Sequence, residues 1–307
     1  MAPTHHDATI VICTALDTEY RAVHSHFAAT GEHHTERGTH YELLRLDTAT
    51  TRWRIVLLLG DRGNDMTAVQ VERAVATFAP RAVLLIGIAG GRADSRHGDV
   101  VAATEIYDYE TGRDNDQGFR PRIKTLNSSY QLVQLAHRVS REGRWRRRIR
   151  HDHRVPPPHS RVAPLAAGGK VVGGNRSRTA RLIDRYCGDA QGVETEGIGL
   201  LRAGYANRAV ATLVIRGISD LLSDKHSKTD DFWQPVAADH AAAFAVELLH
   251  QWEPAAGTAD TVGNNTGRTT PDTYLGAQGA ASTAYIAAQG HRAHGVINIG
   301  NPPYPHR

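Results

Sequence analysis

The segment Ala82-Val83-Leu84-Leu85-Ile86-Gly87-Ile88-Ala89-Gly90-Gly91 decides the fold. Its first half is wholly apolar, which is typical of a central strand that is covered on both faces. The glycines that follow predict a tight turn, in which a missing side chain lets the backbone approach a ligand closely. Tight turns need glycine in any protein, so these glycines alone do not define a site. The segment predicts a buried strand with a candidate site at its end.

Strands and helices are expected to alternate on both sides of this segment. Apolar runs predict further strands at 10–13, 41–46, 53–59, 98–102, 162–167 and 210–216. Apolar spacings of three and four predict helices at about 20–27, 65–78, 129–139, 177–186, 195–206 and 236–252. In the second of these helices, Val69 and Ala76 are expected to face the core. The alternation predicts a three-layer α/β fold with a mixed, mainly parallel sheet between helices, and ligands near the carboxyl ends of strands.

Length and composition predict one large domain with an appendage. The chain has 307 residues, of which 40% are hydrophobic and 22% charged, enough to bury a full core. We expect the domain at 8–253 and a tail at 254–307. The sequence contains neither an apolar run of about 18 residues nor a signal-peptide pattern. Its two cysteines cannot form a disulfide framework. We therefore expect a cytoplasmic protein that does not bind a membrane.

A basic segment accounts for much of the formal charge of +4. Nine arginines lie at 138–161, most densely around Trp145-Arg146-Arg147-Arg148-Ile149-Arg150, and Pro156-Pro157-Pro158 follows. Runs of like charge usually lie in water. We therefore expect a solvated loop insertion at about 140–161 rather than a site for polyphosphate, and we do not expect nucleic acid as a partner.

Four motifs place glycines or carboxylates next to expected strand ends. In chain order they are Thr14-Ala15-Leu16-Asp17-Thr18-Glu19, the glycine segment 87–91, Gly192-Val193-Glu194-Thr195-Glu196-Gly197 and Val214-Ile215-Arg216-Gly217-Ile218-Ser219-Asp220. Each acid also has a purely structural explanation. Glu19 fits an exposed helix position, and the acids at 194 and 196 fit a first helical turn, where the helix dipole favours them. Ser219 and Asp220 fit a helix N-cap.

The order and spacing of these motifs, from about 9 to 252, resemble the methylthioadenosine/S-adenosylhomocysteine nucleosidase branch of the nucleoside phosphorylase superfamily. Residues 216–220 are similar to the R-x-I-S-D motif of that family, 193–197 to its V-E-M-E-G/A motif, and 15–19 to its A-M-x-x-E element. The resemblance implies hydrolysis of the N-glycosidic bond of a purine nucleoside, with adenine as the expected base. Methylthioadenosine and S-adenosylhomocysteine are the model substrates. No cofactor is implied, and we expect a homodimer.

The resemblance also implies a role for each polar side chain. Asp220 would protonate N7 of the departing purine, and Ser219 would help to orient the base. Glu19 would activate the attacking water. Glu196 would hold the 2′- and 3′-hydroxyls of the ribose, while Arg216 would order the carboxylates of the pocket.

The glycine segment and the second acidic motif supply further expected contacts. By the resemblance, Ile88, Ala89 and Gly90 would approach the ribose and the nucleophile. Thr195 occupies the position at which the nucleosidases usually have methionine. This difference removes an apolar contact and leaves the preferred 5′-substituent open.

The segment Ala167-Gly168-Gly169-Lys170-Val171-Val172 is expected to bind the base. Val171 stands where the family usually offers a stacking phenylalanine, so we expect apolar contact without ring stacking. Val172 would supply backbone hydrogen bonds. Lys170 could reach a 5′-phosphate, although a surface lysine is the simpler interpretation. Arg21 and Arg62 are the other candidates for binding phosphate.

Two alternative functions remain open at this point. One is a phosphorylase or a nucleotide N-glycosidase that uses the same site with phosphate, in a bacterial signalling or defence context. The other is a non-catalytic nucleoside-sensing or assembly module, against which the three retained carboxylates speak. The 18 histidines are scattered without a recognisable ligand spacing, so no metal site is expected.

The tail has low charge and contains an eleven-residue repeat. Its units begin at Tyr274, Tyr285 and Val296 and close with glycine, at Gly279, Gly290 and Gly300. The unit Val296-Ile297-Asn298-Ile299-Gly300 looks like the core of amyloid signalling motifs, which suggests self-association through stacked strands. The alternative, which the Gly/Ala/Thr-rich composition favours, is a disordered linker.

Overall fold

The computed structural model describes residues 6–92, 94–151, 154–222 and 227–254, with backbone only at 227–229. The predicted tail repeat lies outside these residues, so tail self-association stays a prediction. Within the described part of the chain, no helix has the length and apolar character needed to span a membrane.

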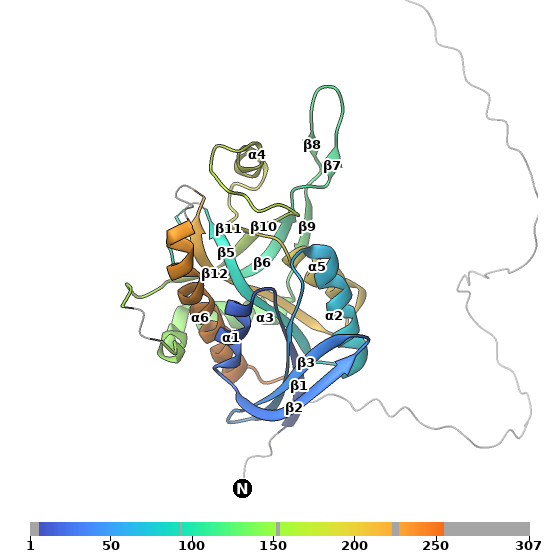
Figure 1. The fold of residues 1–307 in the computed structure, drawn as a ribbon, viewed down its shortest axis with the longest axis vertical. Helices are drawn as coiled ribbons and strands as arrows, with labels where there is room; N and C mark the ends of the chain where they lie inside the picture. The colour runs from blue at the N-terminus through green and yellow to red at the C-terminus, as the bar shows by residue number, and fades with distance from the viewer. Residues whose placement is uncertain (1–5, 93, 152–153, 223–226, 255–307) are drawn as a thin grey trace, which may run out of the picture. The chain divides into compact units, whose positions relative to one another are not determined.

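The fold is built on a mixed sheet of ten strands in the order β11-β10-β6-β12-β5-β1-β4-β3-β2, with β9 paired to β6 (Figure 1). Its strands are β1 (His6–Thr14), β2 (Ala28–Glu36), β3 (Thr39–Asp47), β4 (Thr51–Leu59), β5 (Ala82–Gly91), β6 (Val100–Asp108), β9 (Lys124–Asn127), β10 (Ser160–Ala167), β11 (Gly192–Glu194) and β12 (Ala211–Leu221). A separate hairpin is formed by β7 (Gly112–Arg113) and β8 (Arg120–Pro121).

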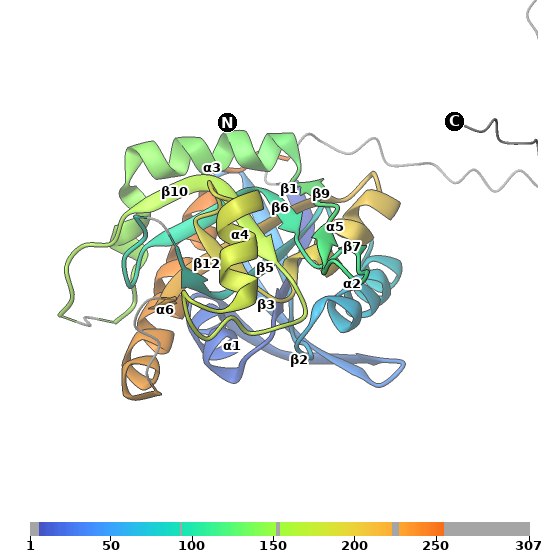
Figure 2. The same cartoon turned by 90° about the horizontal axis from the view of Figure 1, so that it is seen from above.

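Helices cover both faces of this sheet (Figures 1 and 2). One layer contains α1 (Asp17–His24), α3 (Tyr130–Glu142) and α6 (Ser227–Gln251), and the other contains α2 (Asn64–Phe78) and α5 (Gly197–Ala206). A further helix, α4 (Arg178–Tyr186), packs on a smaller apolar cluster beside β10 and β11. The predicted three-layer α/β class is confirmed.

The strand β5 is central because it pairs in parallel with both β1 and β12. Its side chains alternate between two cores: Leu84 and Ile86 join the layer of α1 and α6, whereas Val83 and Leu85 join the layer of α2 and α5. This alternation is what a strand covered on both faces requires. The uninterrupted apolar run in the sequence therefore has a direct structural cause.

The glycine segment differs from the tight turn that we predicted, because β5 continues through it to Gly91. β12 runs beside it as far as Leu221, with a register shift between Ile218 and Asp220. The short strand β11 then pairs in parallel with β10 and antiparallel with β5, opposite Gly90 and Gly91. The turn prediction was wrong because these long-range pairings hold the glycines in extended backbone.

Two other expectations about packing were wrong. α1 ends at His24, so Phe27 is buried just beyond the helix rather than within it. In α2, Val69 is 42% exposed and Ala76 is also exposed, and the buried positions are instead Thr67, Gln70, Val71 and Ala74. The buried face of α2 is determined by its contact with α5, which the spacing of its own residues does not reveal.

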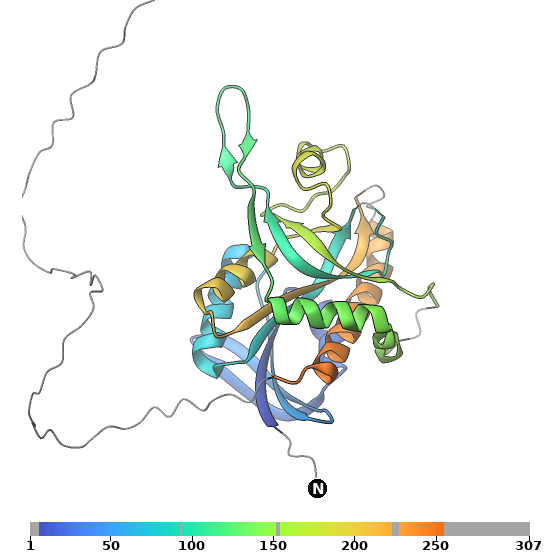
Figure 3. The same ribbon diagram turned by 180° about the vertical axis from the view of Figure 1, so that it is seen from behind.

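The basic segment is only in part the solvated loop that we expected, because Arg141, Arg144, Arg147 and Arg150 are exposed but the segment is anchored to the domain at Trp145. Figure 3 shows α3, in green, lying beside the orange α6, and a 3-10 helix (Arg144–Arg148) follows α3. Trp145 is fully buried, donates from Nε1 to Ser160 Oγ at 3.2 Å and meets Phe244 edge to face. Arg148 pairs with Glu247 on α6. One tryptophan therefore anchors a run of arginines.

We predict that Trp145→Ala lowers the free energy of unfolding by about 3–5 kcal/mol, the usual cost of deleting a fully buried large side chain. Urea denaturation followed by circular dichroism measures this loss. Tyr130→Ala is a matched control, since Tyr130 at the start of α3 is 77% exposed, and it should change stability by less than about 0.5 kcal/mol. Equal, small effects of both substitutions would contradict a packed segment.

Candidate active site

A cavity of about 300 Å³ opens where β5, β11 and β12 end. It is lined by all but one of the residues that the sequence singled out as substrate contacts or catalytic groups: Glu19, Ile88, Ala89, Gly90, Val171, Val172, Thr195, Glu196, Ser219 and Asp220. The exception is Arg216, which does not line the cavity and is fully buried. The four motifs are therefore brought together around one space.

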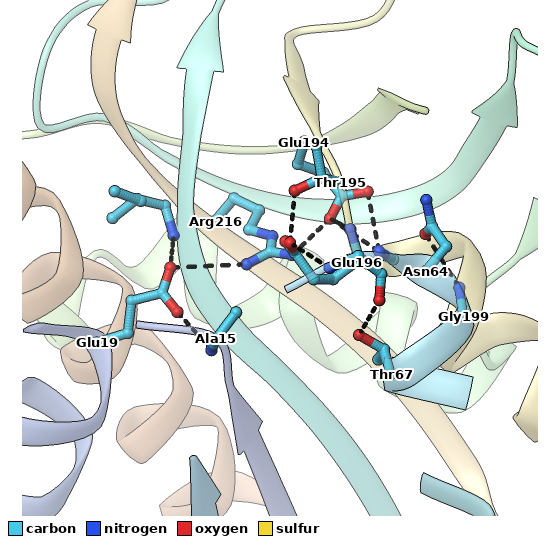
Figure 4. Close-up of polar contacts among 12 residues, drawn as sticks. Ala15, Glu19, Asn64, Thr67, Glu194, Thr195, Glu196, Gly199 and Arg216 are labelled. Carbon is cyan, nitrogen blue, oxygen red and sulfur yellow. Dashed lines mark hydrogen bonds and ion pairs between the residues drawn. The ribbon is translucent and has the colours of Figure 1, made fainter. Parts of the chain in front are cut away.

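Arg216 is the centre of a buried cluster of charges. Its Nη2 donates to Glu194 Oε2 at 2.5 Å and to Glu196 Oε2 at 3.0 Å, while Nη1 lies 3.9 Å from Glu19 Oε1. Figure 4 shows Glu19 on one side of the guanidinium and the other two acids opposite. Burial alone would lower the pKa of Arg216, but the three negative charges outweigh burial and raise it.

The Glu19 carboxylate is 2% exposed, which rules out the exposed helix position considered above. Its Oε2 accepts hydrogen bonds from the N–H groups of Ala15 at 2.8 Å and Leu16 at 3.0 Å, and its Oε1 accepts one from Ile88 at 2.9 Å. Burial raises the pKa of Glu19 and outweighs the lowering by Arg216 and by the backbone donors. The carboxylate is therefore held rigidly and is a stronger proton acceptor than an ordinary glutamate.

The two acids of the 192–197 motif have different environments. Glu194 accepts from the N–H groups of Glu196 at 3.0 Å and Gly197 at 2.8 Å, so it closes the start of α5 as well as pairing with Arg216. Glu196 accepts from Gly63 N–H at 3.2 Å and from Thr195 Oγ1 at 2.5 Å. Both acids line the cavity, but the hydrogen bonds of Glu194 to the start of α5 are those of a structural residue.

Ser219 and Asp220 lie within β12, so they do not cap a following helix. Ser219 Oγ donates to Asp220 Oδ1 at 2.9 Å, and Asp220 is 7% exposed. A Cβ at Gly90 would lie 3.2 Å from Asp220 Oδ2, which makes this glycine a close neighbour of the carboxylate. The register shift in β12 falls at this pair and directs Asp220 to the cavity.

Gly87 has a role that its sequence context did not predict. A Cβ on this residue would collide with Arg216 Nη1 and Glu19 Oε1. We expected the glycines to admit a ligand to the backbone, whereas Gly87 makes room for an ion pair of the protein itself. The glycine itself is visible in the sequence. The reason for it is a contact between three segments that are far apart in the chain.

The three candidate phosphate-binding residues are separated by the structure. Arg21 pairs with Asp17, is 79% exposed on its side chain and does not line the cavity. Lys170 lines the rim and pairs with Glu110 Oε1 at 2.9 Å. Arg62 also lines the cavity and comes from the loop between β4 and α2.

The base-binding segment contributes two unequal valines and is joined by lining residues that sequence reasoning missed. Val172 is buried, but Val171 is 71% exposed at the rim, so it covers less of the cavity than expected. The missed residues are Val193, Leu222, Asp230 and Gln234. The last two are four residues apart on α6, a helical spacing that becomes visible only once the helix is known to begin before Val236. Among the described residues, no group of three or more potential ligands could hold a metal ion.

Two curated relatives that the chain resembles are ATP nucleosidases of Escherichia coli. ATP nucleosidase Cap17 from Escherichia coli (strain KTE188) is 26% identical over 269 residues, which make up 80% of this chain and 52% of the relative. The chain therefore spans about half the length of the curated relatives it matches.

Solved structures with the same fold include several nucleosidases. The 5′-methylthioadenosine/S-adenosylhomocysteine nucleosidase of Neisseria meningitidis in complex with methylthio-immucillin-A is 19% identical, with a TM-score of 0.64 over 80% of this chain and 100% of that one. Native futalosine hydrolase of Helicobacter pylori strain 26695 is also 19% identical, with a TM-score of 0.64 over 80% and 98%. At these identities the likeness shows the fold.

The family comparison covers most of the described chain. A model of the phosphorylase superfamily matches residues 9–250, from β1 to the last turn of α6. This range includes every motif that lines the cavity and the arginine beneath it. The chain belongs to the phosphorylase superfamily.

Proposed function

We propose that the protein hydrolyses the N-glycosidic bond of an adenine nucleoside and releases the free base. The observation that carries this proposal is the convergence of Glu19, Glu196 and Asp220 on one cavity, with Arg216 beneath the first two. Such a bond needs an acid at the base, an acceptor for a proton of water, and acceptors for the ribose hydroxyls. Two of the similar proteins are named as nucleosidases of methylthioadenosine and S-adenosylhomocysteine and of ATP, which supports the same class of reaction.

In the proposed reaction, the bond between C1′ and the purine nitrogen breaks and its electron pair leaves with the base. Asp220 delivers a proton to N7, which makes adenine a neutral leaving group. A water oxygen bonds to C1′ and its proton passes to Glu19. Glu196 accepts hydrogen bonds from the ribose hydroxyls. Positive charge that grows on the sugar is stabilised by the carboxylates around it.

The contacts of Glu19 suit the role of base. A carboxylate has about four lone-pair positions, and the N–H groups of Ala15, Leu16 and Ile88 occupy three of them. In the proposed reaction the attacking water binds at Oε1, which accepts one backbone hydrogen bond against two at Oε2. Because the carboxylate is already held in place, little reorganisation is needed when it accepts the proton.

Thr195 bears on the choice between possible 5′-substituents. Its hydroxyl donates to Glu196 Oε1 rather than offering an apolar surface. This residue therefore supports the ribose-binding acid, and the methylthio group of methylthioadenosine loses one expected contact. Methylthioadenosine and S-adenosylhomocysteine remain candidate substrates to be tested beside adenosine. A homodimer remains a prediction.

Product analysis tests the proposal directly. The purified full chain is incubated with adenosine, methylthioadenosine, S-adenosylhomocysteine and guanosine, with and without inorganic phosphate, and bases and sugars are separated by chromatography. Free adenine together with free sugar, independent of phosphate, is the expected result. Release of ribose 1-phosphate only when phosphate is present would show phosphorolysis, and binding without any base release would show a sensing module.

We predict that Asp220→Asn lowers base release at least about a hundredfold, since an amide cannot deliver a proton to N7. The fold should persist because Asn keeps an oxygen that can accept from Ser219. Turnover is measured with the best substrate of the panel, and thermal unfolding checks the fold. Near-normal turnover in the folded variant would remove Asp220 from the mechanism.

We also predict that Glu19→Gln stops turnover but leaves nucleoside binding in place, because only proton acceptance is lost. The amide NH₂ must face one of the backbone donors now bound by Glu19, so a lower melting temperature is expected as well. Calorimetric titration with adenosine below that temperature measures binding. A folded variant that binds weakly but turns over each bound nucleoside normally would contradict the role of base.

The pH dependence follows from the direction of the shift at Glu19. Burial raises its pKa above the ordinary 4.5, and the group must be ionised to accept a proton. We therefore predict that kcat/KM falls, as the pH decreases, at a pH above 4.5. Initial rates across the acid range, with the fold checked at each pH, test this. A rate that stays constant down to pH 4.5 would contradict it.

A further inference from the structure

Charge is divided between the floor and the rim of the cavity. Glu19, Glu194 and Glu196 are nine-tenths or more buried and share the single positive charge of Arg216, so the floor is acidic. Of the described residues, the cationic groups that line the cavity itself are Arg62 and Lys170, and both are exposed. An anionic part of a ligand therefore finds favourable charge at the rim and unfavourable charge at the floor.

Arg62 is next to the group that we propose binds the ribose. It immediately precedes Gly63, whose N–H donates to Glu196 Oε1 at 3.2 Å. The position of this loop is maintained by Asn64, which donates to the carbonyl of Gly168 at 3.3 Å and accepts from Gly199 N–H at 3.2 Å. The guanidinium thus comes from a backbone that is tied to both the ribose-binding acid and the segment that carries Lys170.

The two cations at the rim differ in how far an acid of the protein compensates their charge. Lys170 Nζ lies 2.9 Å from Glu110 Oε1, so part of its charge is already compensated. For Arg62, the described part of the chain shows no ion pair with an acid. An arginine presents a planar set of donors that matches the oxygens of a phosphate group. Arg62 is therefore the stronger candidate for contact with an anion.

From this arrangement we infer that the substrate is an adenine nucleoside phosphorylated at its 5′-oxygen, with Arg62 as the residue that selects the phosphate and Lys170 beside it. The inference rests on the proposed function, because it places the ribose at Glu196. With the ribose hydroxyls at Glu196, Arg62 is close to the sugar, because the next residue, Gly63, donates to Glu196 Oε1 and Arg62 lines the cavity. Hydrolysis then releases adenine and leaves a sugar that still carries its phosphate.

Inorganic phosphate as the nucleophile is the other source of the same chemistry, and the charges disfavour it. An attacking phosphate must lie beside C1′ near Glu19, where the carboxylates of the floor would repel a second anion. A neutral water meets no such repulsion there. The rim and the floor thus favour different ligands, an esterified phosphate at Arg62 and a water molecule at Glu19.

Paired substrates test the inference. Adenine release from adenosine, AMP, ADP and ATP by the full chain is measured, with and without inorganic phosphate. We expect kcat/KM for the preferred nucleotide to exceed that for adenosine at least about tenfold, the effect of one good charge-assisted contact. In Arg62→Gln this ratio should collapse, mainly through a higher KM for the nucleotide. Arg21→Gln is the matched control, because it removes the same charge near α1 but outside the cavity, and its ratio should match the parent.

The outcomes separate this inference from the proposed function. The inference would be overturned if adenosine were cleaved as well as every nucleotide. It would also be overturned if the ratio of kcat/KM for the nucleotide to that for adenosine were the same in Arg62→Gln as in the control. Either result would leave the proposed hydrolysis intact. Cleavage of adenosine that requires inorganic phosphate would assign the rim cations to the nucleophile and overturn it too. If no compound is cleaved, the proposed function fails, and calorimetric titration then decides. Tighter binding of AMP than of adenosine that is lost in Arg62→Gln would still support a phosphate site at Arg62, and equal binding would overturn it.

Discussion

The buried contact between Arg216 and three carboxylates is the interaction on which the rest of the site depends. It joins β12 to α1 through Glu19 and to the start of α5 through Glu194 and Glu196. Removing one partner of a buried ion pair typically costs about 3–5 kcal/mol, because the other charge is left without compensation. The cluster therefore constrains the chain strongly. Gly87 belongs to the same constraint, since any side chain there would enter the space between Arg216 and Glu19.

This cluster also bears on the hydrolysis that we propose and on the charged substrate that we infer. The single positive charge of the guanidinium holds three carboxylates together, so it is fully compensated and does not attract a further anion. What faces the sugar is an acidic surface that suits a growing positive charge. Among the described residues, the cations that line the cavity lie at its edge, on segments outside the cluster. The chain matches about half of the ATP nucleosidase that it resembles, and its likeness to shorter nucleosidases concerns the fold.

The sequence predicts most of the central sheet and the four site motifs, because apolar runs and acidic motifs are local patterns. It fails where distant segments decide the outcome. Ser219 and Asp220 read equally well as a helix cap until the pairing of β12 with β5 extends the strand through them. The polar, exposed strand β2 carries no apolar alternation and was missed. Similarly, the arginines around Trp145 make the segment look solvent-exposed in the sequence. The burial of Trp145 depends on its contact with α6, which is distant in the chain.

The strand β11 has a consequence for when the site comes into being. It is three residues long, yet it pairs with both β10 and β5 and sets Glu194 against Arg216. The groups that line the cavity come from chain segments as distant as α1 and β12, so the four motifs meet only through long-range contacts. Such contacts form slowly, because the chain between them must first be brought together. A chain still emerging from the ribosome, with β12 not yet made, has no catalytic constellation at all. The nucleosidase activity that we propose is thus absent from every unfinished copy of the domain.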